Sequence, residues 1–267
     1  MPDSVRRSLA DVVSGFDGLS EVSSDILAAL TATADRTEEL RALQPGSLAR
    51  TALAAASASP ASTKVIAAIC EQVASYDDAM FAAFEPSDIA MLLWALAAAG
   101  HRDVPAMTAI GWQLAERAWE FSAEDLAKAV FAFAELRLCH QAMMATVSME
   151  VMWKIDQFSA RSLAQVAESC ARLGYCKEPM FDWLAARVIG RLEDYEPDDL
   201  AAVVCSFAEA SIKHEVLLTT VAGEVARRWP DLHDEELSRF VWAFDKLGVV
   251  HRAAAQPLYH PRLSSSA

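Results

Sequence analysis

The sequence has little glycine and proline, and it contains no long apolar run. Only 9 of its 267 residues are Gly and 10 are Pro, whereas 54% are hydrophobic and 22% are charged. Few chain breakers together with abundant Ala favour helix over sheet, and the apolar fraction is sufficient for an extensive core. No stretch reaches the roughly 18 consecutive apolar residues of a membrane-spanning helix, so we expect no membrane insertion.

Paired cysteines and clustered histidines are also lacking. No CxxC pair occurs, and the cysteines stand mostly in apolar surroundings, which indicates reduced thiols in an intracellular or organellar compartment. The five are Cys70, Cys139, Cys170, Cys176 and Cys205. The 6 His are scattered along the chain, so we expect no zinc site and no other metal or cofactor. Residues 1–16 show no clear signal or transit peptide.

Positive charge and catalytic motifs are scarce. The chain has 23 Lys and Arg against 37 Asp and Glu, a formal net charge of −14. This balance argues against generic polyanion binding, because phosphate contacts supply most of the non-specific affinity for nucleic acid. The sequence has no phosphate-binding glycine loop, HExxH, GxSxG or kinase signature. The carboxylate pair Asp198–Asp199 stands at a predicted helix start, so we expect no enzyme.

The chain does contain a repeat. Similar phrases begin every 37 residues, at Phe84, Phe121, Phe158, Tyr195 and Leu232. With each of these at offset zero, the phrases read FEPSDIA, FSAEDLA, FSARSLA, YEPDDLA and LHDEELS. The pattern extends upstream to Leu43 and, more weakly, to Ser4. We predict a divergent repeat or cap over 1–42, an irregular repeat with a longer loop over 43–83, regular repeats over 84–250 and a flexible tail over 251–267.

Each repeat is predicted to hold two helices. The first starts with Pro at the first helical position or with a Ser N-cap, at Pro45, Pro86, Pro197, Ser122 and Ser159. It ends near offset 16, where a helix end favours a residue with left-handed backbone conformation. Glycine adopts this conformation readily, and the glycines at this offset are Gly100, Gly174 and Gly248. The second helix has apolar residues at offsets 23, 26 and 30, such as Phe181, Leu184 and Val188. One such hairpin cannot bury its faces alone, whereas stacked copies can. The sequence therefore predicts an all-α solenoid of about six and a half helical-hairpin repeats.

The first helix is predicted to have one constant face and one variable face. Offsets 5, 8, 9, 12 and 15 share one face, which we expect to be core, as at Leu126, Ala129, Val130, Phe133 and Leu136. Offsets 7, 10 and 14 lie opposite. The candidate RNA contacts there are Arg50, Lys128, Gln165 and Arg239 at offset 7, Trp94, Phe131 and Trp242 at offset 10, and Arg172 and Lys246 at offset 14.

These residue types suit single-stranded RNA, because Arg and Lys contact phosphates or base edges, Gln bonds an adenine-like edge and aromatic rings stack on unpaired bases. Two alternatives remain open. A solvent-facing position varies when nothing constrains it, and an aromatic residue that flanks a helix often packs on the adjacent repeat.

A second row of basic residues recurs at offset 33, near the end of the second helix. Its members are Arg117, Lys154, Arg191 and Arg228. They could follow a sugar–phosphate backbone as a ladder. The alternative is that Lys and Arg are favoured in the last helical turn by the helix dipole.

The segments SDIAMLLWALAAAG, EDLAKAVFAFAELR and EELSRFVWAFDKLG resemble the first-helix signature of the heptatricopeptide and octotricopeptide repeat families, which also occur in RAP-domain and FAST-kinase-like proteins. The 37-residue period suits the heptatricopeptide form. This resemblance implies sequence-selective binding of single-stranded RNA in a mitochondrion or plastid, in support of transcript stability, processing, translation or ribosome assembly, and it implies no catalysis. The alternative hypothesis is a protein–protein interaction scaffold or a structural subunit of an organellar complex.

Overall fold

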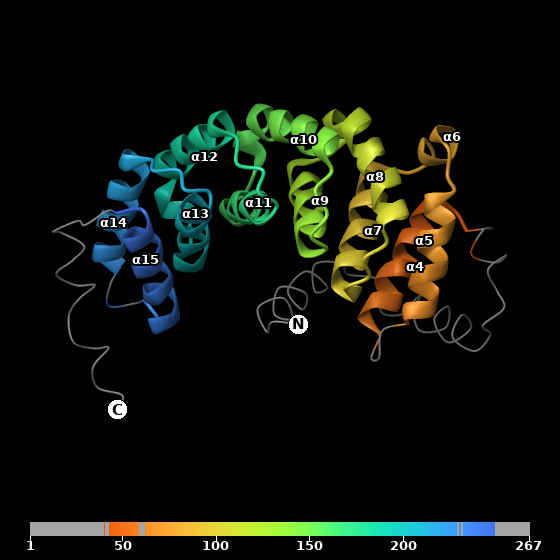
Figure 1. Ribbon diagram of the computed structural model, residues 1–267, viewed down its shortest axis with the longest axis horizontal. Coiled ribbons are helices and arrows are strands. Elements are labelled where there is room, and N and C mark those ends of the chain that lie inside the picture. The colour runs from red at the N-terminus through yellow and green to blue at the C-terminus, as the bar shows by residue number, and fades with distance from the viewer. Residues whose placement is uncertain (1–39, 41–42, 59–61, 229, 231, 249–267) are drawn as a thin grey trace. The chain divides into compact units, whose positions relative to one another are not determined.

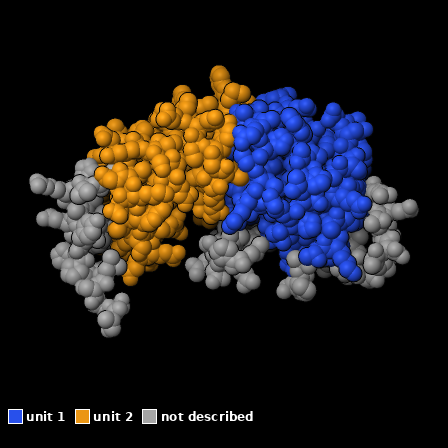
Figure 2. All heavy atoms as spheres, in the orientation of Figure 1, with its two compact units in different colours: residues 1–146 blue, residues 147–267 orange. Residues whose placement is uncertain are grey.

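A computed structural model describes residues 40, 43–58, 62–228, 230 and 232–248, and these residues form helices and connecting turns without any strand (Figure 1). The predicted cap over 1–42, apart from Leu40, and the predicted tail over 251–267 lie outside the described residues. Within the described ranges no helix is long and apolar enough to cross a membrane. The chain divides into two compact units, residues 1–146 and 147–267 (Figure 2).

The first unit contains two complete described hairpins and the first helix of a third. The hairpins are α4 (Pro45–Ser57) with α5 (Thr63–Ala74) and α7 (Pro86–Ala99) with α8 (Val104–Arg117), and α9 (Ala123–Glu135) follows. A short α6 (Asp78–Phe81) and a 3₁₀ turn η1 (Ala118–Glu120) separate the repeats. First helices pack in series, α4 on α7 and α7 on α9, and the second helix α5 packs on α8 (Figure 1).

The second unit repeats this arrangement. It begins within α10 (Gln141–Trp153), which is followed by η2 (Ile155–Gln157). Its hairpins are α11 (Ala160–Arg172) with α12 (Glu178–Gly190) and α13 (Pro197–Glu209) with α14 (Glu215–Arg228), and they are followed by α15 (Asp234–Lys246). The turn η3 (Leu192–Asp194) precedes α13. Helix α11 packs on α13, α13 on α15, and α12 on α14. The predicted all-α helical-hairpin solenoid is therefore confirmed.

The irregular repeat over 43–83 has its additional residues after the second helix. It spans 41 residues, from Leu43 to the residue before Phe84, against 37 in each regular repeat. Helices α4 and α5 begin at offsets 2 and 20, as α7 and α8 do. The segment SASPASTK at 57–64 suggested that the longer loop joins the two helices of this repeat. The additional residues instead form α6 between α5 and α7.

The first helices begin as predicted. Pro45, Pro86 and Pro197 occupy the first helical turn, where a missing N–H is not needed. The two serine N-caps also form. The hydroxyl of Ser122 accepts from the amide of Asp125 at 3.1 Å, and that of Ser159 accepts from the amide of Ser162 at 3.1 Å.

The first helices end in a left-handed residue at offset 16 in every regular repeat. Gly100, Gly174 and Gly248 have φ of 62°, 67° and 65°, as predicted. Arg137 and Ser211 stand at the same offset with φ of 52° and 58°, although neither residue is favoured there. The amide of the next residue then bonds back into the helix, for example from Ile212 to the carbonyl of Phe207 at 2.9 Å.

The predicted core is buried. Leu126, Phe133 and Phe181 are at most 1% exposed, and the offset-zero aromatics Phe121 and Tyr195 are 1% and 2% exposed. Rings also meet between neighbouring hairpins, since Phe181 and Phe207 lie edge to face with centroids 4.9 Å apart. Each hairpin thus buries its apolar faces on its neighbours, which is the packing that defines a solenoid.

Candidate nucleic-acid interface

Two arginines of the offset-33 row bond to backbone carbonyls of the protein. Arg117 at the end of α8 donates to the carbonyls of Phe81 at 3.0 Å and Phe84 at 3.2 Å, and it pairs with Glu120 at 2.7 Å. These bonds tie the end of the second helix to the turn that precedes the first helix of the same repeat.

Arg228 makes the same bonds in the second unit. It donates to the carbonyl of Tyr195 at 2.7 Å and to that of Leu192 at 3.4 Å, and it also pairs with Glu224. Both arginine side chains are less than one fifth exposed. We refer to Arg117 and Arg228, with the carbonyls that each binds, as the arginine clamps.

The other two members of the offset-33 row form local ion pairs. Lys154 pairs with Glu150 at 3.2 Å, and Arg191 pairs with Asp194. The side chain of Arg191 is 39% exposed, the highest fraction in the row. All four basic groups therefore engage protein acceptors, and the row is not a free ladder of positive charge.

In the repeat that begins at Phe158, a different arginine occupies the place of the clamp. Arg187 of α12 donates to the carbonyl of Asp156 at 3.2 Å and pairs with its carboxylate at 2.8 Å. The bonded carbonyl again lies in the turn before the first helix. The clamp function is thus present in this repeat, four residues earlier in the second helix than Arg191.

Two of the charged side chains at offset 7, Arg239 and Arg50, interact with acidic residues at the start of an adjacent first helix. Arg239 of α15 pairs with Asp198 of α13 at 3.1 Å. Burial raises the pKa of the neighbouring Asp199, and the charges of Arg161 and Arg239 partly offset that rise. Positive and negative groups consequently alternate between these helices. The edge of the first helices offers mixed donors and acceptors, and its positive charge is discontinuous.

The first unit has the same alternation. Burial raises the pKa of Asp88 in α7, and its backbone hydrogen bond and the charge of Arg50 in α4 act against the rise. Arg50 also donates to the hydroxyl of Ser47 at 3.4 Å. The charge of Arg50 in α4 therefore interacts favourably with Asp88 in α7, whether or not Arg50 also contacts RNA.

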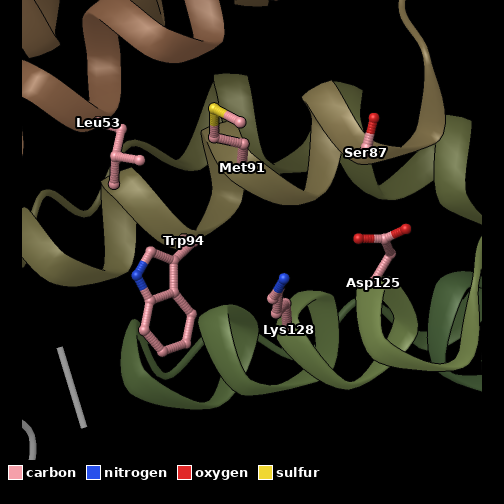
Figure 3. Close-up of a pocket in the computed structure, with 6 residues that line it drawn as sticks. All are labelled: Leu53, Ser87, Met91, Trp94, Asp125 and Lys128. Atoms are coloured by element: carbon pink, nitrogen blue, oxygen red, sulfur yellow. The ribbon is translucent and has the colours of Figure 1, made fainter. Parts of the chain in front are cut away.

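Lys128 lies at a small hollow of the first unit. The lining residues come from α4, α7 and α9 and are Leu53, Ser87, Met91, Trp94, Asp125 and Lys128 (Figure 3). Figure 3 shows the ammonium of Lys128 pointing from α9 toward α7, and it pairs with Glu124 at 2.8 Å. The hollow holds about 70 Å³, which is room for a few water-sized groups. Such a volume suits a small polar group such as a phosphate oxygen or a carbonyl.

The offset-10 aromatics divide into packed and exposed residues. Trp94 is 4% exposed and stacks on Phe131 of the next first helix with centroids 5.1 Å apart. The packing alternative therefore describes this pair, and Trp94 presents no open ring face for a base. Trp242 is 44% exposed, and the ammonium of Lys246 lies 4.8 Å from its ring centroid. Of the three predicted aromatics, Trp242 offers the most accessible ring.

The remaining candidates lie on α11. Gln165 is partly exposed, and Arg172 has a side chain 42% exposed that pairs with Glu168 at 2.7 Å. Helices α11 and α15 of the second unit thus carry five of the candidates between them, and both helices pack on α13. On α15, Arg239, Trp242 and Lys246 follow one another at intervals of three and four residues, so they share one side of that helix.

Sequence reasoning missed a set of exposed tryptophans on and next to the second helices. Trp112 and Trp119 of the first unit are 53% and 67% exposed, and Trp153 and Trp183 of the second unit are 84% and 55% exposed. The signal that could have identified them is their offset, because none stands on the buried stripe at offsets 23, 26 and 30. Exposed tryptophans of this kind are typical of protein interfaces.

Comparison with known families assigns nearly the whole chain to one group. A family model described as RNA-editing substrate-binding complex 6 protein matches residues 6–265. No curated protein matches the chain significantly.

Proposed function

The chain belongs to the RNA-editing substrate-binding complex 6 family, and from this membership we propose that it is an RNA-binding helical-repeat component of an RNA-editing complex. The family description supports a place in RNA metabolism. The role proposed for this chain is to bind single-stranded RNA in a mitochondrion or plastid, through repeats of the heptatricopeptide kind. It acts by binding and carries out no chemistry on the RNA.

The observation that carries this proposal is the stripe of Arg239, Trp242 and Lys246 on α15. An exposed indole supplies a stacking surface for an unpaired base, and the flanking guanidinium and ammonium supply charge for the adjacent phosphates. The stripe combines the two features within about two turns of helix, and Trp242 is 44% exposed. Binding at this stripe accommodates the net charge of −14 because several carboxylates at helix starts are engaged within the protein. Asp125 accepts from the hydroxyl of Ser122, Glu236 accepts from the amide of His233, and Asp198 pairs with Arg239.

Selectivity would come from residues that change between otherwise equal repeats. Offset 7 presents Arg50, Lys128, Gln165 and Arg239 on a constant helical scaffold. Charged and amide side chains at this offset, with Met91 and Ala202 at the same offset of the intervening repeats, would give different bound nucleotides different donor patterns. The ion pair of Arg239 with Asp198 is partly exposed and contributes little, so Arg239 can exchange this carboxylate for an RNA acceptor at small cost.

The test is binding of the full chain to RNA recovered from the native source, measured at two salt concentrations. Trp242→Ala is expected to weaken binding by about 1–3 kcal/mol, the range for loss of one stacked base. Lys246→Ala is expected to weaken binding and to reduce the slope of log K against log salt by about 0.7, as for one phosphate contact on a single strand.

Matched controls lie elsewhere on the same unit. Trp183→Ala removes a tryptophan of similar exposure from α12, and Lys213→Ala removes an exposed lysine from the turn before α14. Neither change should alter RNA affinity or the salt slope. If no RNA is enriched, or if Trp242→Ala and Trp183→Ala behave alike, the RNA-binding proposal is wrong.

A second candidate function is a scaffold that holds a protein of the same complex. The observation that favours it is the exposure of Trp153 and Trp183, since tryptophan is enriched among the residues that dominate interface energies. The test is to purify the complex from the native source before and after RNA digestion. A partner that stays bound without RNA and is released by Trp153→Ala supports the scaffold role, whereas full release by digestion contradicts it.

A further inference from the structure

Three potential metal ligands converge where α5 meets the turn between α7 and α8. Cys70 lies in α5 and is 1% exposed, and His101 and Asp103 flank that turn and are partly exposed. One donor atom of each, namely the thiol sulfur, an imidazole nitrogen and a carboxylate oxygen, lies within 4.8 Å of the other two. In the part of the chain that the structure describes, no other group of three His, Cys, Asp or Glu side chains approaches so closely.

The same place in later repeats shows what ordinary packing requires there. Cys70 stands at offset 27, and the later repeats carry Gly111, Ser148, Ala185 and Ala222 at that offset. A small residue is needed because it faces the start of the next second helix. At Gly111, for instance, an added Cβ would lie 2.8 Å from the ring of His140.

The other two positions have equally clear counterparts. The offset of His101 holds Leu138, Tyr175 and Ile212 in later repeats, and the offset of Asp103 holds His140, Lys177 and His214. The structural role of the latter offset is to cap the second helix, since the Nδ1 atoms of His140 and His214 accept from backbone amides at 3.2 and 3.1 Å. Cys, His and Asp occupy the three offsets together at one interface only among the described repeats.

Asp103 can cap and bind a metal simultaneously. Its Oδ1 atom accepts from the amide of Ala106 at 2.9 Å, which satisfies the start of α8. The second carboxylate oxygen is not needed for that cap. The turn is further fixed by Gly100, whose φ of 62° ends α7 directly before His101. The three ligands are therefore positioned by helix ends and by a buried helix face, which are rigid supports.

Although the scattered His predicted no metal site, the geometry differs, and we propose that Cys70, His101 and Asp103 form a zinc site that links the repeat over 43–83 to the repeat that begins at Phe84. Thiolate, imidazole and carboxylate are the ligand types of protein zinc, and the thiolate and imidazole select Zn²⁺ over Mg²⁺ and Ca²⁺. Tetrahedral coordination at Zn²⁺ places ligand atoms about 3.3–3.8 Å apart, so modest side-chain rotation closes the site. Water completes the fourth position, and binding releases the thiol proton to solvent.

The test uses the chelator-treated full chain and Co²⁺ as a spectroscopic probe. The expected result is one Co²⁺ bound per chain with a thiolate-to-cobalt charge-transfer band, displaced by Zn²⁺. Zinc at 100 times the dissociation constant should also stabilise the fold by about 2.7 kcal/mol. The variants Cys70→Ser and His101→Leu copy residues that other repeats carry, so they are expected to fold. Asp103→Asn keeps a good helix cap and removes the charged ligand.

Each of the three variants should weaken Co²⁺ binding by more than about tenfold, and Cys70→Ser should abolish the charge-transfer band. The matched controls are Cys170→Ser, another buried thiol, and Cys139→Ser, an exposed one. Both should retain the band. Absence of the band in the native chain, or its loss in either control with retention in Cys70→Ser, overturns the proposal. Because this site is distant in sequence from α15, its failure leaves the RNA-binding proposal unaffected.

Discussion

The arginine clamp of the second unit gives a quantitative test that separates packing from RNA contact. Arg228 is 18% exposed and donates to the carbonyls of Tyr195 and Leu192. A hydrogen bond from a charged donor contributes about 1.5–3 kcal/mol. The bond at 2.7 Å is close to ideal and the one at 3.4 Å is weak, and the partly exposed ion pair with Glu224 adds about 0–1 kcal/mol.

We therefore expect Arg228→Ala to lower the free energy of unfolding by about 2–3 kcal/mol. For a chain of this size each kcal/mol shifts the thermal midpoint by about 2–4 °C, so the midpoint should fall by about 4–12 °C. Arg228→Lys keeps the charge but loses the forked geometry, and we expect it to cost about half as much. Urea unfolding followed by circular dichroism gives the free energies, and native-state hydrogen exchange locates the loss in α13 and α14.

The control is Arg191→Ala, since Arg191 is 39% exposed and pairs only locally with Asp194. Its removal should change stability by less than about 1 kcal/mol. The reasoning is refuted if Arg228→Ala leaves stability within about 0.5 kcal/mol and instead reduces the salt slope of RNA binding by about 0.7, the value for a lost phosphate contact.

Three further predictions concern stability. Ser211→Gly should stabilise the protein by about 0.5–1 kcal/mol, because φ of 58° strains a residue with a Cβ. Gly174→Ala should destabilise it by about 1 kcal/mol, because it places a Cβ at φ of 67°. Urea unfolding measures both changes. Trp94→Ala should cost about 3–5 kcal/mol through loss of a buried ring and leave RNA affinity of the folded chain unchanged. Burial raises the folded-state pKa of Asp199 above its unfolded value, so the charged form costs stability above the folded pKa and the cost disappears as pH falls through it. Asp199→Asn should accordingly raise the thermal midpoint at neutral pH. The substitution should also weaken the dependence of stability on pH in the acidic range where Asp199 titrates.

The fold was predictable because the residues that start and end helices recur at the same positions of the 37-residue period in several repeats. Pro86 and Ser122 mark helix starts by different chemistry, yet both stand at equivalent places in the 37-residue period. The period also places Arg137 at the offset of the left-handed glycines, although a left-handed residue was predicted only at Gly100, Gly174 and Gly248. Repetition therefore carried information that no single residue held.

The site was less predictable, because a period places a residue without naming its partner. Arg228 and Trp94 both stand in rows that suggested RNA contact. Arg228 instead reaches carbonyls 33 and 36 residues earlier, and Trp94 stacks on a ring of the next repeat. Whether a side chain at a given offset contacts the protein or the solvent depends on how the hairpins pack in three dimensions. The offset alone does not contain that information.

The arginine clamp also bears on how the length of this array could change. The stronger bond of Arg228 goes to Tyr195, the first residue of its own repeat, whereas the weaker one goes to Leu192 at the end of the preceding repeat. Excision of residues 158–194 would join Gln157 directly to Tyr195 at equivalent positions of the period. Both partners of the Arg228–Tyr195 bond would be retained, and Ile155 would take the place of Leu192 in the preceding turn. Because each repeat contacts mainly its neighbours, a gene segment that encodes one 37-residue repeat could be lost or duplicated without changes in the neighbouring hairpins.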